Sequence, residues 1–224
     1  MSIKTKVLTA VATLAVALGL STVGAAPASA ATPQCGPHCI QIFNAKYGTP
    51  ANPGFVESVF GGIAKAGVPT GVHRVSSHNP AGDIIVSRVG LVSDFYATGM
   101  VSAAVNRHYG NLQGVQVEYA PRGKATGLCS GVATTAYQNE GLSLVPCSTP
   151  GTTVFIIDTA DSPATAPTYY PIVSASTTDF VHPYTMTIDG NPAHECFVRI
   201  RLRHLIGNPG HVPQNQLWGS NVLN

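Results

Sequence analysis

The stretch Gly127-Leu-Cys-Ser-Gly-Val132, followed by Leu144-Val-Pro-Cys147, decides how this sequence is expected to fold. The same pattern of apolar positions occurs earlier, at Gly54-Phe-Val-Glu-Ser-Val59 and Val72-His-Arg-Val-Ser-Ser77. When the two pairs of segments are superimposed, the first copy has valine at both positions where the second has cysteine. Such self-similarity at a fixed spacing indicates a repeated structural unit.

A third, weaker copy follows in the last part of the chain. It begins at Pro183-Tyr-Thr-Met-Thr-Ile188, continues through Val198–Arg203, and ends at Gln214-Asn-Gln-Leu-Trp-Gly219. Three copies of one short unit predict a fold with threefold pseudo-symmetry.

Short strand-like segments separated by turn residues make up most of the chain, which has 23 glycines and 17 prolines. They alternate in polarity or are apolar throughout, and this pattern predicts an all-β sandwich or barrel. The expected strands are Val115–Tyr119, Leu142–Val145, Val154–Ile157, Tyr184–Ile188 and Val198–Arg203. The segment Phe55–Ala66 is left open between helix and strand, because its apolar spacing fits a helical face while Gly61-Gly62 favours a turn.

These residues resemble a repeat of the ricin B-type lectin family. Gly127-Leu-Cys129 and Leu144-Val-Pro-Cys147 resemble the cysteine pair of that repeat, and Gln216-Leu-Trp218 resembles its Gln-x-Trp ending. Thr153-Val-Phe155 stands where the second repeat should show the same ending. The resemblance implies a β-trefoil-like domain of three degenerate repeats over residues 54–224, a Cys129–Cys147 disulfide and binding of galactose-like sugars.

The sugar site implied by the resemblance is incomplete. The family has an acidic residue just after the first cysteine position and an aromatic residue two positions before the second. The acidic position aligns here with Ser58, Gly131 and Thr187, none of which is acidic. The residues most similar to the sugar-binding residues of the family lie in the first repeat. We therefore take Glu57, His73 and Asn79 as candidate ligand-binding residues. The alternative is that all three are ordinary surface residues.

The N-terminus has the layout of a secretory signal peptide. A basic start is followed by the apolar run Val7–Leu20 and by small residues that end at Ala30. The run is shorter than the roughly 20 residues that a membrane-spanning helix needs. We expect residues 1–30 to be a signal peptide, residues 31–53 a short extension, and the protein to be secreted without a membrane span.

Export decides how the five cysteines are interpreted. Cys35 and Cys39 flank a Gly-Pro turn, which favours a local disulfide over a metal site that would recruit His38. Cys196 is then the cysteine most readily left over. It could be buried or could pair between chains, or the Cys35–Cys39 pairing could be wrong.

The charge pattern excludes one class of partner. The formal net charge is +2, and apart from Lys4 and Lys6 acidic and basic residues are equal in number. A neutral body lacks the cationic surface from which nucleic-acid affinity comes. Arg199, Arg201 and Arg203 form a stripe that would suit an anionic polymer or serve solubility alone. We expect no cofactor and no metal site, and the sequence leaves the oligomeric state open.

Three functions remain for this sequence. The first is a non-catalytic, lectin-like carbohydrate-binding protein for extracellular or cell-wall glycans. The second is a structural or protein-interaction domain that has lost sugar binding. The third is a secreted hydrolase, for which Asp158-Thr-Ala160 resembles the aspartic protease signature. That chemistry needs two carboxylates that share a proton, and the second copy of the signature is missing.

Overall fold

The structure is a computed structural model that describes residues 35, 39–76, 79–207 and 211–222. The chain divides into two units, Met1–Ala30 and Ala31–Asn224. All described residues belong to the second unit, so the predicted signal peptide lies outside them.

Six strands form a closed barrel. They follow one another around it as β1 (Cys39–Asn44), β4 (Ile84–Leu91), β5 (Gln113–Tyr119), β8 (Phe155–Ile157), β9 (Ile172–Ser174) and β13 (Trp218–Val222). The ring closes because β13 pairs with β1 and bridges to the start of β9 through Tyr170 and Trp218. A closed barrel leaves no unpaired sheet edge along this path.

Three hairpins cover one end of the barrel. They consist of β2 (Phe55–Val59) with β3 (Thr70–Arg74), β6 (Leu128–Gly131) with β7 (Ser143–Pro146), and β10 (Tyr184–Thr187) with β12 (Arg201–His204). The short strand β11 (Val198–Arg199) pairs with β3 and so joins the third hairpin to the first. Four short 3-10 helices lie in the connections, η1 (Phe60–Gly62), η2 (Pro80–Gly82), η3 (Pro121–Gly123) and η4 (Gln214–Gln216).

A ring of three backbone hydrogen bonds joins the hairpins. The Thr70 amide donates to the Leu142 carbonyl at 3.0 Å, the Leu142 amide to the Ile200 carbonyl at 3.0 Å, and the Ile200 amide to the Thr70 carbonyl at 3.2 Å. Each residue occupies the same place in its own repeat, so the cycle is a direct expression of threefold pseudo-symmetry.

The barrel strands show the same symmetry in their register. Within the three repeats the equivalent pairs are Ile40 with Ile84, Val115 with Phe155, and Tyr170 with Trp218. Phe155 therefore occupies the place of Trp218, as predicted from the position of Thr153-Val-Phe155. The all-β, β-trefoil-like prediction with three degenerate repeats is confirmed.

The first repeat starts earlier than the sequence analysis expected. We expected residues 31–53 to be an extension and the domain to begin at 54. Strand β1 lies within that segment, and it pairs with β2, β4 and β13. The apolar residues of Cys39–Asn44 thus provide the first barrel strand.

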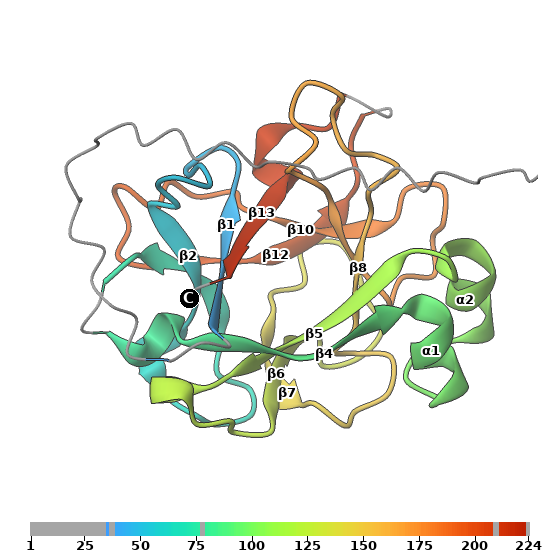
Figure 1. Cartoon of the computed structure of the whole chain (residues 1–224), viewed down its shortest axis with the longest axis horizontal. Helices are drawn as coiled ribbons and strands as arrows, with labels where there is room; N and C mark the ends of the chain where they lie inside the picture. Colours follow the sequence, from blue (N-terminus) through green and yellow to red (C-terminus); the bar gives the residue numbers. More distant parts are fainter. Residues whose placement is uncertain (1–34, 36–38, 77–78, 208–210, 223–224) are drawn as a thin grey trace, which may run out of the picture. The chain divides into compact units, whose positions relative to one another are not determined.

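Two helices lie in the connection between the first repeat and the second. These are α1 (Val92–Ala97) and α2 (Ala103–Tyr109), at the right of Figure 1. Ser102 accepts a hydrogen bond from the Val105 amide at 3.2 Å, as an N-cap does. Neither helix was predicted from the sequence, because elements of one or two turns carry little periodicity.

The structure defines the secondary structure of two segments more closely than the sequence did. Phe55–Ala66 begins as strand β2 and turns at Gly61 and Gly62, whose φ values of 63° and 66° suit glycine. Val198–Arg203 is divided into β11 and β12 at Ile200, because its first half pairs with β3 and its second with β10.

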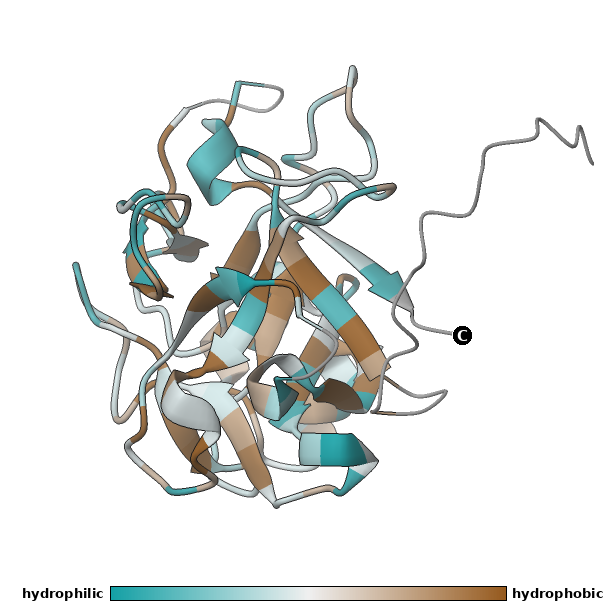
Figure 2. Cartoon of the chain, turned by 90° about the vertical axis from the view of Figure 1, so that its left-hand side faces the viewer, coloured by the Kyte–Doolittle hydropathy of each residue, from teal (hydrophilic) through white to brown (hydrophobic). Residues whose placement is uncertain are grey.

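The main apolar core lies inside the barrel and under the hairpins, where the strands in the middle of Figure 2 are mostly brown. Trp218 and Phe155 are buried there, and the Trp218 indole donates to the Met186 carbonyl at 2.8 Å. Gln216 is also buried and donates to the His204 carbonyl at 2.9 Å. Both residues of the Gln-x-Trp ending therefore hold the third repeat together.

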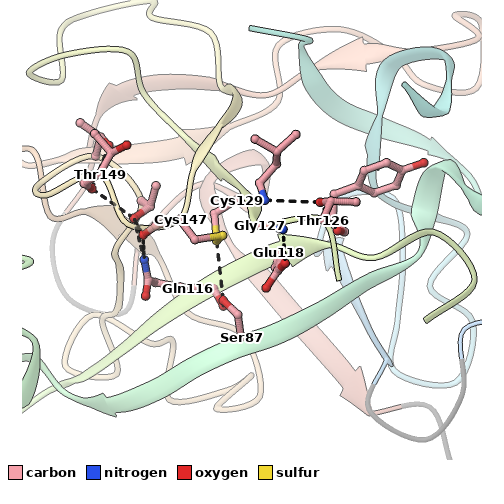
Figure 3. The surroundings of a disulfide bond; sticks show 12 residues. Ser87, Gln116, Glu118, Thr126, Gly127, Cys129, Cys147 and Thr149 are labelled. Carbon is pink, nitrogen blue, oxygen red and sulfur yellow. Dashed lines mark hydrogen bonds between the residues drawn. A yellow bond between two sulfur atoms is a disulfide. The ribbon is translucent and has the colours of Figure 1, made fainter. Parts of the chain in front are cut away.

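Both predicted disulfides are present. Cys129–Cys147 joins β6 to the turn after β7, and Cys35–Cys39 closes a local loop at the start of β1. Around the first of these, Gln116 donates to the Cys147 carbonyl at 2.7 Å (Figure 3). Cys196 is an exposed free thiol.

Candidate functional site

The structure places the three predicted ligand residues apart. Glu57 is buried, with 2% of its surface exposed. In the β2–β3 register it stands opposite Val72, the neighbour of His73, so Glu57 and His73 lie on opposite faces of the hairpin. Asn79 accepts a hydrogen bond from the Ala81 amide at 3.0 Å and caps η2. The three side chains do not form one surface site.

The positions that the lectin resemblance assigns to an acidic residue are also buried. Ser58 and Thr187 are buried. A Cβ atom on Gly131 would lie 2.5 Å from the Thr152 carbonyl oxygen, so this position has no room for a side chain. A sugar site of the lectin type is therefore incomplete in all three repeats.

Two residues of the arginine stripe, Arg199 and Arg201, border a groove. Arg199 donates to the Gly141 carbonyl at 3.4 Å, and Arg201 donates to the Asn139 carbonyl at 3.0 Å. Arg203 forms an ion pair with Asp189. Each guanidinium thus has one protein contact that orients it, while a guanidinium carries five N–H donors in total.

The groove has a volume of about 370 Å³ and lies between the η1 turn of the first repeat and the β10–β11 connection of the third. Its walls are formed by Phe60, Pro69, Asp189, Gly190, Glu195, Phe197, Val198, Arg199 and Arg201. Of these residues, only Arg199 and Arg201 were considered from the sequence as a binding surface, because the groove joins segments from two repeats.

An aromatic pair forms the apolar part of the groove. The rings of Phe60 and Phe197 meet edge to face, with their centroids 5.2 Å apart. Phe60 is 52% exposed although it is strongly apolar. Gly71 in β3 makes the arrangement possible, because a Cβ atom there would lie 2.6 Å from the Phe197 ring. Such an exposed ring offers a face or edge to a ligand.

Two carboxylates complete the rim of the groove. Glu195 accepts a hydrogen bond from the Asn191 amide at 3.2 Å, and Asp189 is oriented by Arg203. With Arg199 and Arg201, the groove presents both acceptors and donors beside an exposed ring. Rigid polar groups next to an apolar surface suit a ligand with many hydroxyl groups and apolar C–H faces.

A second, wider depression of about 880 Å³ lies beside α2. Its Asp158 carboxylate accepts the Ala160 amide at 3.1 Å, so the Asp-Thr-Ala segment closes β8 into a turn. Burial raises the Asp158 pKa, and the neighbouring Asp161 carboxylate adds to this effect. The Phe180 ring packs against His108, with the centroids 5.2 Å apart. The one phenylalanine ring in this depression, Phe180, is only partly exposed, unlike Phe60.

Within the described part of the chain, no three histidine, cysteine or acidic side chains come together as metal ligands would. Nor does any helix in the described ranges have the length and apolar content that crossing a membrane requires.

No family model matches the sequence, and no curated protein matches it. Solved structures do resemble the fold. A designed threefold symmetric protein, ThreeFoil, has a TM-score of 0.53 at 9% identity, and the match covers 82% of this chain and 97% of that one. The structure of a mosquitocidal holotoxin has a TM-score of 0.53 at 10% identity, covering 83% of this chain and 17% of the toxin. At these identities the likeness shows the fold alone, and it agrees with the threefold barrel described above.

Proposed function

We propose that this protein is a secreted, non-catalytic carbohydrate-binding protein and that the groove beside Phe60 and Phe197 holds the sugar. The observation that carries the proposal is the exposed phenylalanine pair flanked by oriented carboxylates and guanidinium groups. A sugar ring could place its C–H face on the aromatic pair while its hydroxyl groups bond to Asp189 and Glu195.

The location of the protein is part of the same proposal. The signal peptide predicted at residues 1–30 and the two disulfides support export to an oxidising compartment. An extracellular or cell-wall glycan is then the ligand class that the protein would meet.

The test is a glycan array probed with the oxidised protein, followed by calorimetry on any glycan that it retains. We expect binding at micromolar concentration and at least a tenfold loss in Phe60→Ala and in Asp189→Asn. Tyr137→Ala is the matched control, because Tyr137 is 57% exposed and does not line the groove. Equal affinities for the wild type and Phe60→Ala would show that the sugar does not bind in this groove.

The second candidate function is a protein-interaction domain that no longer binds sugar. It is favoured by the burial of Ser58, Gly131 and Thr187 at the family's acidic positions. A folded protein that retains no glycan on the array would support this function over the first.

A further inference from the structure

The barrel contains a second, separate space. A cavity of about 290 Å³ extends inward from the barrel end remote from the hairpins, and aliphatic side chains from β1, β4, β5, β8 and β9 line it. This volume equals that of about ten liquid waters and lies near the lower limit of small-molecule sites.

The closed end of the cavity is formed by one residue from each hairpin. Glu57, Ser130 and Met186 all line it, and in their hairpins they stand opposite Val72, Leu144 and Leu202. The three are therefore equivalent under the pseudo-symmetry. Two repeats fill this position with a hydroxyl or a thioether, so the fold itself does not require a carboxyl group there.

The other end of the cavity reaches the surface. Val89 is 62% exposed and Ser220 is exposed, and both line the cavity. The Ser220 hydroxyl lies 3.1 Å from the Tyr170 hydroxyl, which places a polar pair at this end. A small molecule could enter here without unfolding the barrel.

Glu57 carries the one carboxyl group among the residues that line the cavity. Ser130 Oγ donates to its Oε1 at 2.5 Å and lies 3.0 Å from Thr70 Oγ1. No described residue hydrogen-bonds to Oε2. Oε2 is not among the fully enclosed polar atoms that lack a partner, so it borders open space that a hydrogen-bonding group in the cavity can occupy.

We propose that the barrel interior binds a small, mainly apolar alcohol, whose chain fills the cavity and whose hydroxyl group bonds to the free oxygen of Glu57. A hydroxyl group can donate to a carboxylate or accept from a carboxylic acid, so it suits either state of Glu57. Burial raises the Glu57 pKa to about 7, so both states are populated near neutral pH. The site is independent of the proposed glycan groove, with which it shares no lining residue.

The test compares 1-hexanol with its isomer dipropyl ether by calorimetry on the full, oxidised protein. The two probes have the same atoms, but only hexanol has an O–H group. We expect hexanol to bind about tenfold more tightly than the ether, as one hydrogen bond to a buried partner predicts. Equal affinities, or no binding of either probe, would overturn the proposal.

Two variants locate the site. Glu57→Met copies the third repeat and should remove the preference for hexanol while the ether still binds. Ser220→Trp should weaken both probes at least tenfold by obstructing the open end, whereas Ser148→Trp, at an exposed turn serine outside the cavity, should leave both unchanged. Unchanged hexanol binding in a folded Ser220→Trp protein would contradict the location, whatever the glycan array shows.

Discussion

The indole N–H of Trp218 donates a 2.8 Å hydrogen bond to the carbonyl oxygen of Met186, and both side chains are buried. The bond joins β13 in the barrel wall to β10 in the third hairpin. Phe155, the equivalent residue of the second repeat, has no N–H group in its side chain and cannot donate such a bond. The third repeat therefore holds its hairpin with a contact that the second repeat lacks.

Replacing Trp218 by phenylalanine should destabilise the domain. The variant loses the bond to Met186, and a smaller ring leaves a gap in a close-packed core, so we expect a loss of about 2–4 kcal/mol in the free energy of unfolding. Urea unfolding followed by circular dichroism measures it, because the variant lacks the chain's single tryptophan. A midpoint equal to that of the wild type would show that the indole bond contributes nothing.

The stability of the domain should fall as the pH rises from about 4.5 to 7. Burial raises the Glu57 pKa from 4.5 to about 7, with the Ser130 hydrogen bond opposing in part. Between these values the folded protein binds more protons than the unfolded chain, so the Glu57 contribution is full below pH 4.5 and is lost through about pH 7. The difference between the two pKa values corresponds to about 3 kcal/mol in the free energy of unfolding.

Glu57→Gln isolates this contribution. Unfolding free energies are measured for wild type and variant at pH 4, 5, 6, 7 and 8. The difference between them should change sharply over this window, because glutamine does not titrate. Parallel curves for the two proteins would show that Glu57 does not carry the pH dependence.

The repeat pattern predicted the fold because the residues that carry it are structural. Cys129 and Val56 were aligned from sequence, and the hairpin registers place them opposite Val145 and His73 at equivalent points. β1 was missed because its repeat equivalents carry no shared motif. The alternation in Val115–Tyr119 predicted a half-buried strand, yet Gln116 is buried as well, since β5 is covered on both faces.

The candidate groove could not be predicted in the same way. Phe60 belongs to the first repeat and Phe197 to the third, and nothing in the sequence indicates that they meet. Glu57 was predicted as a ligand-binding residue at the surface, whereas the structure buries it, because the direction of its side chain was not apparent from one sequence. Its alignment with the buried Ser130 and Met186 could have placed it in the barrel.

The Cys129–Cys147 disulfide should contribute measurably to stability. Replacing both cysteines by valine copies Val56 and Val75 of the first repeat and preserves apolar volume. The bond spans 18 residues, and a loop of this length predicts a loss of about 3 kcal/mol. Guanidinium unfolding followed by Trp218 fluorescence checks the value, and a loss below 1 kcal/mol would contradict the prediction.

Cys196 should be the thiol that reacts in the native, oxidised protein. The other four cysteines are paired, and Cys196 is exposed. Titration with a thiol reagent should give one equivalent without denaturant, and Cys196→Ser should give none. Two or more equivalents in the native state would show that one of the disulfides is open.

Gly141 provides a sharper test of the groove than removal of an arginine. A Cβ atom at this position would lie 2.1 Å from Arg199 Nε and 2.4 Å from its Cζ. The nearest atoms belong to a flexible, exposed side chain, so Gly141→Ala should fold normally but force the guanidinium away from the Gly141 carbonyl. We expect at least a fivefold loss of glycan affinity with a change in unfolding free energy below about 1 kcal/mol.

Gly82→Ala is the matched control for this variant. A Cβ atom there would meet Ser58 Oγ at 3.4 Å, an ordinary contact distance, and Gly82 does not line the groove. Calorimetry with the glycan retained by the wild type compares the two alanine variants. If both bind like the wild type, the orientation of Arg199 is unimportant for recognition and the sugar rests on the aromatic pair and the carboxylates alone.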